Sequence, residues 1–95
     1  MVVGMLKLTL RIHDTQSLKE KRKVVKSVIA RIRNKFNVSI AEVGSNDKWQ
    51  IAELGICTVG NDRRFINSTI DNIISYLDSI YIGEIIHSDI EILNV

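Results

Sequence analysis

The hydrophobic pattern of this chain changes period four times, and the order of these changes restricts the fold. Alternation of apolar and polar side chains predicts half-buried strands, whereas apolar side chains at helical spacing predict amphipathic helices. The predicted strands cover residues 2–12, 38–44, 49–59 and 84–93, and the predicted helices cover residues 17–36 and 62–81. The polar turn at residues 45–48 joins the second and third strands as a hairpin.

The apolar residues of each element predict which side chains form the core. The expected inward-facing strand residues are Leu6, Leu8, Leu10, Ile12, Ala52, Leu54, Ile56, Thr58, Ile86, Ile90 and Ile92. The second helix is expected to pack through Phe65, Ile66, Ile70, Ile73, Ile74, Leu77 and Ile80, with Asn61 or Asp62 as its cap. Tyr81, Ile82 and Gly83 are expected to form the turn that follows. The side taken by Glu42 is ambiguous, because Val38 and Ile40 alternate against Ala41 and Val43.

Two βαβ-like halves in the order βαββαβ predict a ferredoxin-like α+β sandwich. In such a fold, two helices cover one face of a four-stranded antiparallel sheet whose strand order is 4-1-3-2. The chain has 95 residues, so residues 1–95 are expected to form one domain that buries about 60% of its unfolded surface.

The predicted first helix concentrates positive charge. Ser17 and Glu20 form a capping box at its start. Eight of the 13 basic residues follow: Lys19, Lys21, Arg22, Lys23, Lys26, Arg31, Arg33 and Lys35. At about 100° per residue, one flank carries Lys19, Arg22, Lys23, Lys26 and Arg33. Arg31 and Lys35 lie on the opposite flank, and Lys21 is expected close to the edge of the buried stripe.

Charge is also unequal between the two parts of the sequence. Residues 1–36 carry ten Lys and Arg against two acidic residues, a charge of +8, whereas residues 37–95 carry three against nine, a charge of −6. This separation favours an acidic partner for the basic side, or packing between copies of the protein. Neutralisation of one part by the other on folding is the remaining alternative.

The expected compartment is the cytoplasm. The single cysteine, Cys57, excludes an internal disulfide framework and fits a reducing environment. The first residues lack a basic segment followed by a long apolar core, and no apolar run approaches about 18 residues, so neither secretion nor membrane insertion is expected.

No group of residues specifies a reaction, a metal site or a cofactor site. His13 and His87 are expected on neighbouring strands near Asp14 and Glu84, but there is no closely spaced pair of ligands. The chain also lacks a phosphate-binding glycine motif and the aromatic residues with which central strands of RNA-recognition domains stack on bases. Trp49 is therefore expected to cover the core or an interface rather than to stack on a base. The protein is not expected to be an enzyme.

The uncovered face of the sheet is expected to mix opposite charges with apolar side chains. Met5, Ile51 and Val59 fall on this face together with Lys7 and Glu53. Such a surface suits self-association or partner docking better than nucleic-acid binding. If a homodimer forms, this face or an edge strand is expected to provide the contact.

The run Ser17-Leu18-Lys19-Glu20-Lys21-Arg22 and the segment 31–43 resemble the YlxP-like family of small bacterial proteins of unknown function. The resemblance covers nearly the whole chain, including Trp49 after the hairpin turn. It implies a ferredoxin-like fold and a cytoplasmic protein encoded near genes for translation and ribosome maturation, beside ribosome-binding factor A and initiation factor 2. The family provides no catalytic residues to transfer.

These observations favour a non-enzymatic RNA- or ribosome-associated binding protein. The residues expected to contact phosphates of structured RNA or ribosomal particles are Lys19, Arg22, Lys23, Lys26 and Arg33. The alternative is a protein-interaction or dimerisation module with an acidic protein partner.

Overall fold

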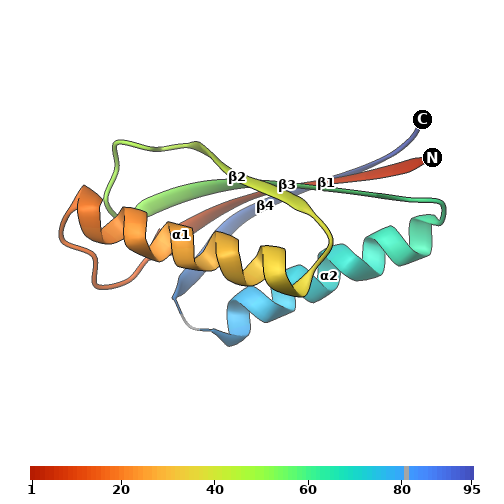
Figure 1. Cartoon of the computed structure of the whole chain (residues 1–95). Coiled ribbons are helices and arrows are strands. Elements are labelled where there is room, and N and C mark those ends of the chain that lie inside the picture. Colours follow the sequence, from red (N-terminus) through yellow and green to blue (C-terminus); the bar gives the residue numbers. More distant parts are fainter. Residues whose placement is uncertain (81) are drawn as a thin grey trace.

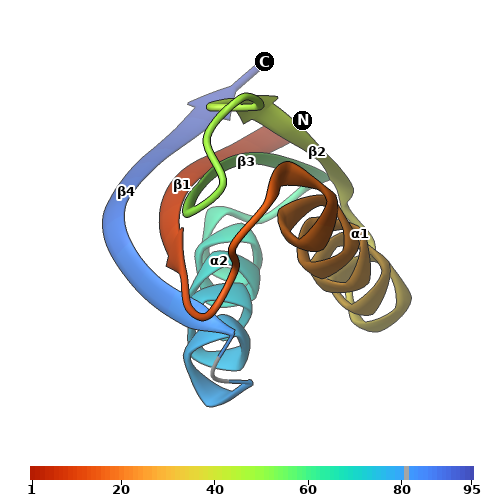
Figure 2. The same ribbon diagram turned by 90° about the vertical axis from the view of Figure 1, so that its left-hand side faces the viewer.

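The computed structural model describes residues 1–80 and 82–95 and has the predicted element order (Figure 1). The elements are β1 (Val2–Ile12), α1 (Leu18–Lys35), β2 (Ser39–Gly44), β3 (Ile51–Gly60), α2 (Arg63–Ser79) and β4 (Gly83–Asn94). All neighbouring strands are antiparallel, and their order is β2-β3-β1-β4. Both helices lie on one side of the curved sheet, and its other face is open (Figure 2). The predicted ferredoxin-like α+β sandwich is confirmed.

The core lies between the sheet and the two helices. Alternate residues of β1 from Leu6 to Ile12 are buried, as are Ala52, Leu54 and Ile56 of β3. The same cluster includes Val25, Val28 and Ile32 of α1, Ile66, Ile70, Ile73 and Leu77 of α2, and Val2 and Ile40 of the sheet. β1 and α2 approach closely at Gly4, where a Cβ atom would collide with the Ile66 side chain. The inward-facing side chains of the strands and the helices therefore form one apolar layer between the sheet and the helices.

Side chains fix the starts of both helices. The Ser17 hydroxyl accepts a hydrogen bond from the Glu20 amide at 3.1 Å, and the Glu20 carboxylate accepts one from the Gln16 amide at 2.7 Å. In the usual capping box the glutamate accepts a hydrogen bond from the amide of the cap residue. Here it accepts one from the residue before the cap, Gln16. Asp62, rather than Asn61, caps α2 by accepting a hydrogen bond from the Arg64 amide at 2.9 Å.

Three residues predicted to be buried are exposed. The pairing of β1 with β4 shifts between Thr9 and Leu10, so that Ile85 pairs with Leu10. Because of this irregularity Ile86 has no partner residue on β1, and it is 43% exposed. Ile90 keeps its pairing with Leu6 but lies on an edge strand and is 46% exposed. Phe65 is 64% exposed in the first turn of α2, beside the buried Ile66.

The boundaries of some elements also differ from the prediction. β3 begins at Ile51 rather than at Trp49, because residues 49 and 50 form a bend. Trp49 is 51% exposed, so it does not cover the core, and the other expected role, at an interface, stays a prediction. α2 ends at Ser79, and the predicted turn that follows includes Tyr81, which lies outside the described residues. Neither α1 nor α2 has the length and apolar character needed to cross a lipid bilayer.

Candidate functional site

The outer surface of α1 carries the predicted basic residues. Its buried side consists of Lys21, Val25, Val28 and Ile32, which face the sheet. All five residues singled out from the sequence are exposed, and together they are called the basic flank here: Lys19, Arg22, Lys23, Lys26 and Arg33. At a rise of about 1.5 Å per residue, the basic flank extends over about 21 Å of helix.

The acidic second part of the chain does not neutralise the basic flank by direct contact. Within residues 1–80 and 82–95, no carboxylate oxygen lies within 4.0 Å of the charged nitrogen atoms of these five side chains. The acids that form ion pairs do so elsewhere: Glu53 with Lys7, Glu84 with Arg11 and Glu42 with Lys21. The basic flank therefore presents positive charge to solvent.

Arg33 differs from the other members of the basic flank. Its Nη2 atom donates a hydrogen bond at 3.3 Å to the carbonyl of Ile40 on β2. This contact holds the guanidinium against the edge of the sheet, while its remaining N–H groups stay available to a ligand. Sequence periodicity places Arg33 on the correct flank but does not reveal this contact, because the contact depends on how α1 crosses β2.

Of the other two exposed basic residues of α1, Lys35 faces α2. The Lys35 ammonium lies 5.2 Å from the centroid of the Tyr76 ring, which also meets Phe36 edge-on at 6.1 Å. Arg31 and Lys23 line a hollow of about 370 Å³ that Ile82 borders from the segment before β4. Lys35 thus lies apart from the basic flank, as the helical angles predict, whereas Arg31 borders the same hollow as Lys23.

Lys21 occupies the centre of the buried side of α1 rather than its edge. Its side chain is 1% exposed, and its ammonium donates a hydrogen bond at 2.6 Å to the Ser45 carbonyl. The Glu42 carboxylate oxygen Oε2 lies 2.9 Å away and forms an ion pair with it. No donor among the described residues points at that oxygen with good hydrogen-bond geometry.

The sequence contains a signal for this buried pair. The helical angle of Lys21 falls between those of Val28 and Ile32, which are both buried. Glu42 pairs with Leu54 across the sheet and therefore faces the helices, which resolves the ambiguity of β2. A lysine at such an angle requires an acid across the core, and Glu42 provides it.

Ser45, in the hairpin turn after β2, forms hydrogen bonds both with Lys21 of α1 and with Glu53 on the open face of the sheet. The Ser45 hydroxyl donates a hydrogen bond at 2.8 Å to Glu53, whose carboxylate also lies 3.6 Å from the Lys7 ammonium. The Ser45 hydroxyl and, to a smaller extent, Lys7 hold the pKa of Glu53 below its ordinary value. Ser45 has a positive φ of 56°, so the chain turns sharply where Lys21 binds it.

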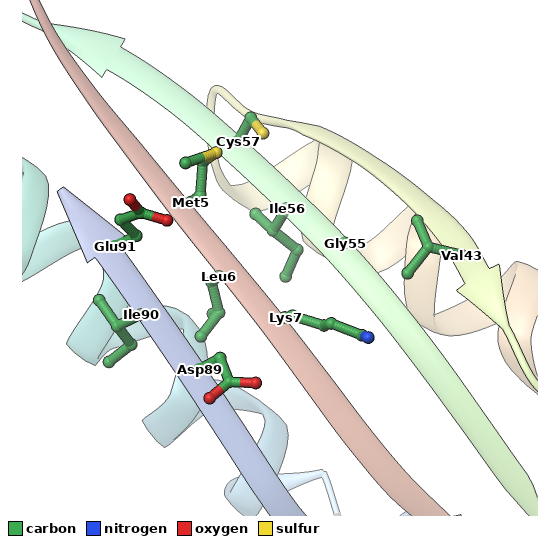
Figure 3. A pocket seen from close by; sticks show the side chains of 10 residues that line it. All are labelled: Met5, Leu6, Lys7, Val43, Gly55, Ile56, Cys57, Asp89, Ile90 and Glu91. Atoms are coloured by element: carbon green, nitrogen blue, oxygen red, sulfur yellow. The ribbon is translucent and has the colours of Figure 1, made fainter. Parts of the chain in front are cut away.

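The open face contains a hollow of about 570 Å³ above Gly55 (Figure 3). Met5 and Cys57 lie on one side of it, and Val43 extends over Gly55 from β2. Acids outnumber bases on this face: Glu53, Glu84, Asp89 and Glu91 against Lys7 and Arg11. This composition makes the open face a poor surface for phosphates, in contrast to the basic flank.

The structure does not bring the two histidines together. His87 pairs with Thr9 across the sheet, whereas His13 lies four residues further along, beyond the end of β1. His87 instead contacts Asp89 at 3.2 Å. Within the described part of the chain, no group of three or more His, Cys, Asp or Glu side chains could hold a metal ion.

The sequence matches a family without a known function. The profile of the family described as "Protein of unknown function (DUF503)" matches residues 3–90. The uncharacterized protein YlxP of Bacillus subtilis (strain 168) is 38% identical over 78 residues, which are 82% of this chain and 85% of that protein.

Solved structures share the fold at low sequence identity. The de novo designed protein Foldit4 has a TM-score of 0.52 at 11% identity, with 99% of this chain and 97% of that chain covered. SnoaB, a cofactor-independent oxygenase from Streptomyces nogalater, has a TM-score of 0.51 at 9% identity, with 99% and 92% covered. Identities this low establish similarity of fold alone.

Proposed function

Because this chain belongs to the DUF503 family, whose function is unknown, we propose that it is a non-enzymatic protein that binds structured RNA or ribosomal particles. The observation that supports this proposal best is the exposed basic flank, which has no acidic partner within 4.0 Å among the described residues. Lys and Arg side chains that neutralise phosphates release condensed counterions, and this release favours binding.

The basic flank suits contacts with the phosphate backbone better than contacts with base edges. Its members are long cationic side chains on the outer face of one helix, and no aromatic residue lies among them. Phosphate contacts of this kind position a protein on RNA without reading its sequence. The five side chains extend over about 21 Å of α1, which is long enough to meet several phosphates of a folded RNA.

A protein-interaction or dimerisation module is the alternative function. The observation that favours it lies on the open face, where Val43 is 54% exposed and Val59 is 61% exposed. Exposed apolar side chains beside a hollow are typical of docking surfaces. In this alternative a second copy or another protein docks on the sheet, or an acidic protein binds α1 in place of RNA.

We expect the purified protein to bind an RNA stem-loop most tightly at low salt. If the basic flank neutralises four or five phosphates, log Kobs should fall linearly with log salt, with a slope of about −4 between about 50 and 200 mM. Fluorescence polarisation of a labelled stem-loop measures this slope. Poly-glutamate of similar charge serves as the control ligand.

Two results would lead us to abandon RNA binding. The first is no detectable association at the lowest salt, where electrostatic affinity is greatest. The second is binding of poly-glutamate as tightly as RNA, which would indicate an acidic protein partner instead.

A further inference from the structure

The single tryptophan of the chain lies largely outside the core. Trp49 is 51% exposed in the bend before β3, and it borders a hollow of about 380 Å³. The hollow is lined by Asp47, Lys48, Trp49, Gln50 and Ile51. Aromatic side chains contribute most to stability when they are buried, so a tryptophan held at the surface is typical of a contact site.

The backbone around Trp49 is fixed against the rest of the molecule. The hydroxyl of Thr15, itself 4% exposed, donates a hydrogen bond at 2.7 Å to the Trp49 carbonyl. The Ile12 amide donates one at 2.7 Å to the Gln50 carbonyl. Two hydrogen bonds to residues distant in the sequence therefore hold the backbone that carries the exposed ring.

These hydrogen bonds place the backbone of Trp49 beside the start of α1. Thr15 precedes the helix cap by two residues, and Lys21 in the second turn holds the other end of the hairpin through the Ser45 carbonyl. The hairpin turn accordingly lies next to the first turns of α1 (Figure 1). Lys19 and Arg22 also occupy these turns, so the backbone of Trp49 lies near the end of α1 at which the basic flank begins.

We propose that Trp49 stacks on an unpaired nucleobase of an RNA whose phosphates bind the basic flank. This inference rests on the proposed function and adds the ligand class, which is a folded RNA with an unpaired nucleotide beside its stem. An aromatic side chain at the end of a row of cationic residues combines the two elements of single-strand binding, which are stacking and phosphate attraction.

The residues beside Trp49 favour a nucleobase as the occupant of the hollow. Lys48 adds a cation for the adjoining phosphate. The Asp47 carboxylate accepts hydrogen bonds, and the Gln50 amide both donates and accepts them, so the two side chains can pair with the edge of a base. A wholly apolar peptide segment would leave these polar groups without partners.

Two RNAs that differ only in an unpaired nucleotide test this inference. One is a blunt stem, and the other is the same stem with one bulged adenosine, each labelled at its far end. Polarisation of the label reports binding to the basic flank, and the emission of Trp49 reports stacking. We expect both RNAs to bind with similar salt slopes and only the bulged RNA to quench Trp49.

The matched variants are Trp49→Ala and Trp49→Phe. Trp49→Ala should weaken binding of the bulged RNA about tenfold or more and should change binding of the blunt stem less than about twofold. Trp49→Phe should retain part of the affinity, because its ring still stacks. Circular dichroism of both variants should match the wild type, because Trp49 is half exposed.

The two readouts separate this inference from the proposed function. Equal quenching by both RNAs, or an equal effect of Trp49→Ala on both affinities, would overturn the stacking role while leaving RNA binding intact. If polarisation shows that neither RNA binds the wild type, the proposed function fails, and the stacking role fails with it.

Discussion

Reversing three charges on the basic flank is expected to abolish RNA association and to leave the fold intact. The variant changes Lys19, Lys23 and Lys26 to Glu, and all three side chains are exposed. Each surface change should cost less than about 0.5 kcal/mol, and attraction of the new carboxylates at positions 19 and 26 to Arg22, which lies one helical turn from both, should offset part of the loss. Affinity for the RNA stem-loop should fall by about 100-fold or more, because attraction becomes repulsion.

A second triple variant controls for net charge. Lys35, Arg63 and Arg64 lie outside the basic flank, and changing them to Glu alters the net charge by the same amount. Glutamate in the first turn of α2 also suits the helix dipole. The control should co-sediment with ribosomal particles within a few-fold of the wild type, whereas the flank variant should remain in the supernatant.

Either of two outcomes would remove the basic flank from the mechanism. A folded flank variant that still co-sediments like the wild type would show that these lysines do not bind RNA. An equal loss in both triple variants would show that binding depends on total charge rather than on the position of the charge.

Replacing the buried lysine is expected to have the largest effect on stability. Lys21→Met leaves the Glu42 carboxylate, 17% exposed, without its ion pair and leaves the Ser45 carbonyl without its donor. Breaking a buried pair by removing one partner is strongly destabilising, so the free energy of unfolding should fall by about 2–4 kcal/mol. Urea denaturation followed by circular dichroism measures this loss.

A double-mutant cycle separates the ion pair from simple packing. Adding Glu42→Gln to Lys21→Met removes the uncompensated charge and should recover more than about 1 kcal/mol of the loss. Lys26→Met is the matched control, because it makes the same change at an exposed site of the same helix. Additive effects of the two mutations, or a Lys21→Met variant as stable as the wild type, would contradict the role of the pair.

The fold could be predicted from the sequence because its patterns are local and agree with one another. The alternation in β1, the capping box at Ser17 and the helical stripe of α2 each specify an element without reference to distant residues. Ile86 could not be placed correctly, because the irregularity of β4 arises from its pairing with β1. Phe65 lies about 100° around α2 from the buried Ile66 and therefore falls beside the buried stripe, although it belongs to the same turn.

The candidate site was only partly predictable. Exposure of the basic flank follows from helical angles alone. Burial of Lys21, the contact from Arg33 to Ile40 and the exposure of Trp49 depend on where β2 and its hairpin lie against α1. Such contacts join segments that are distant in the sequence, and periodicity within one element does not determine them.

The most direct test of the central claim is to map the RNA contact on the protein by NMR. Amide signals of the 95-residue chain would be followed during titration with the bulged stem-loop at low salt. We expect the largest shifts at the exposed positions of residues 19–33 and in the hairpin turn at residues 47–50. Signals of Lys7 and Glu91 on the open face should remain unchanged. Shifts confined to the open face, or no shifts at any RNA concentration, would contradict RNA binding by the basic flank.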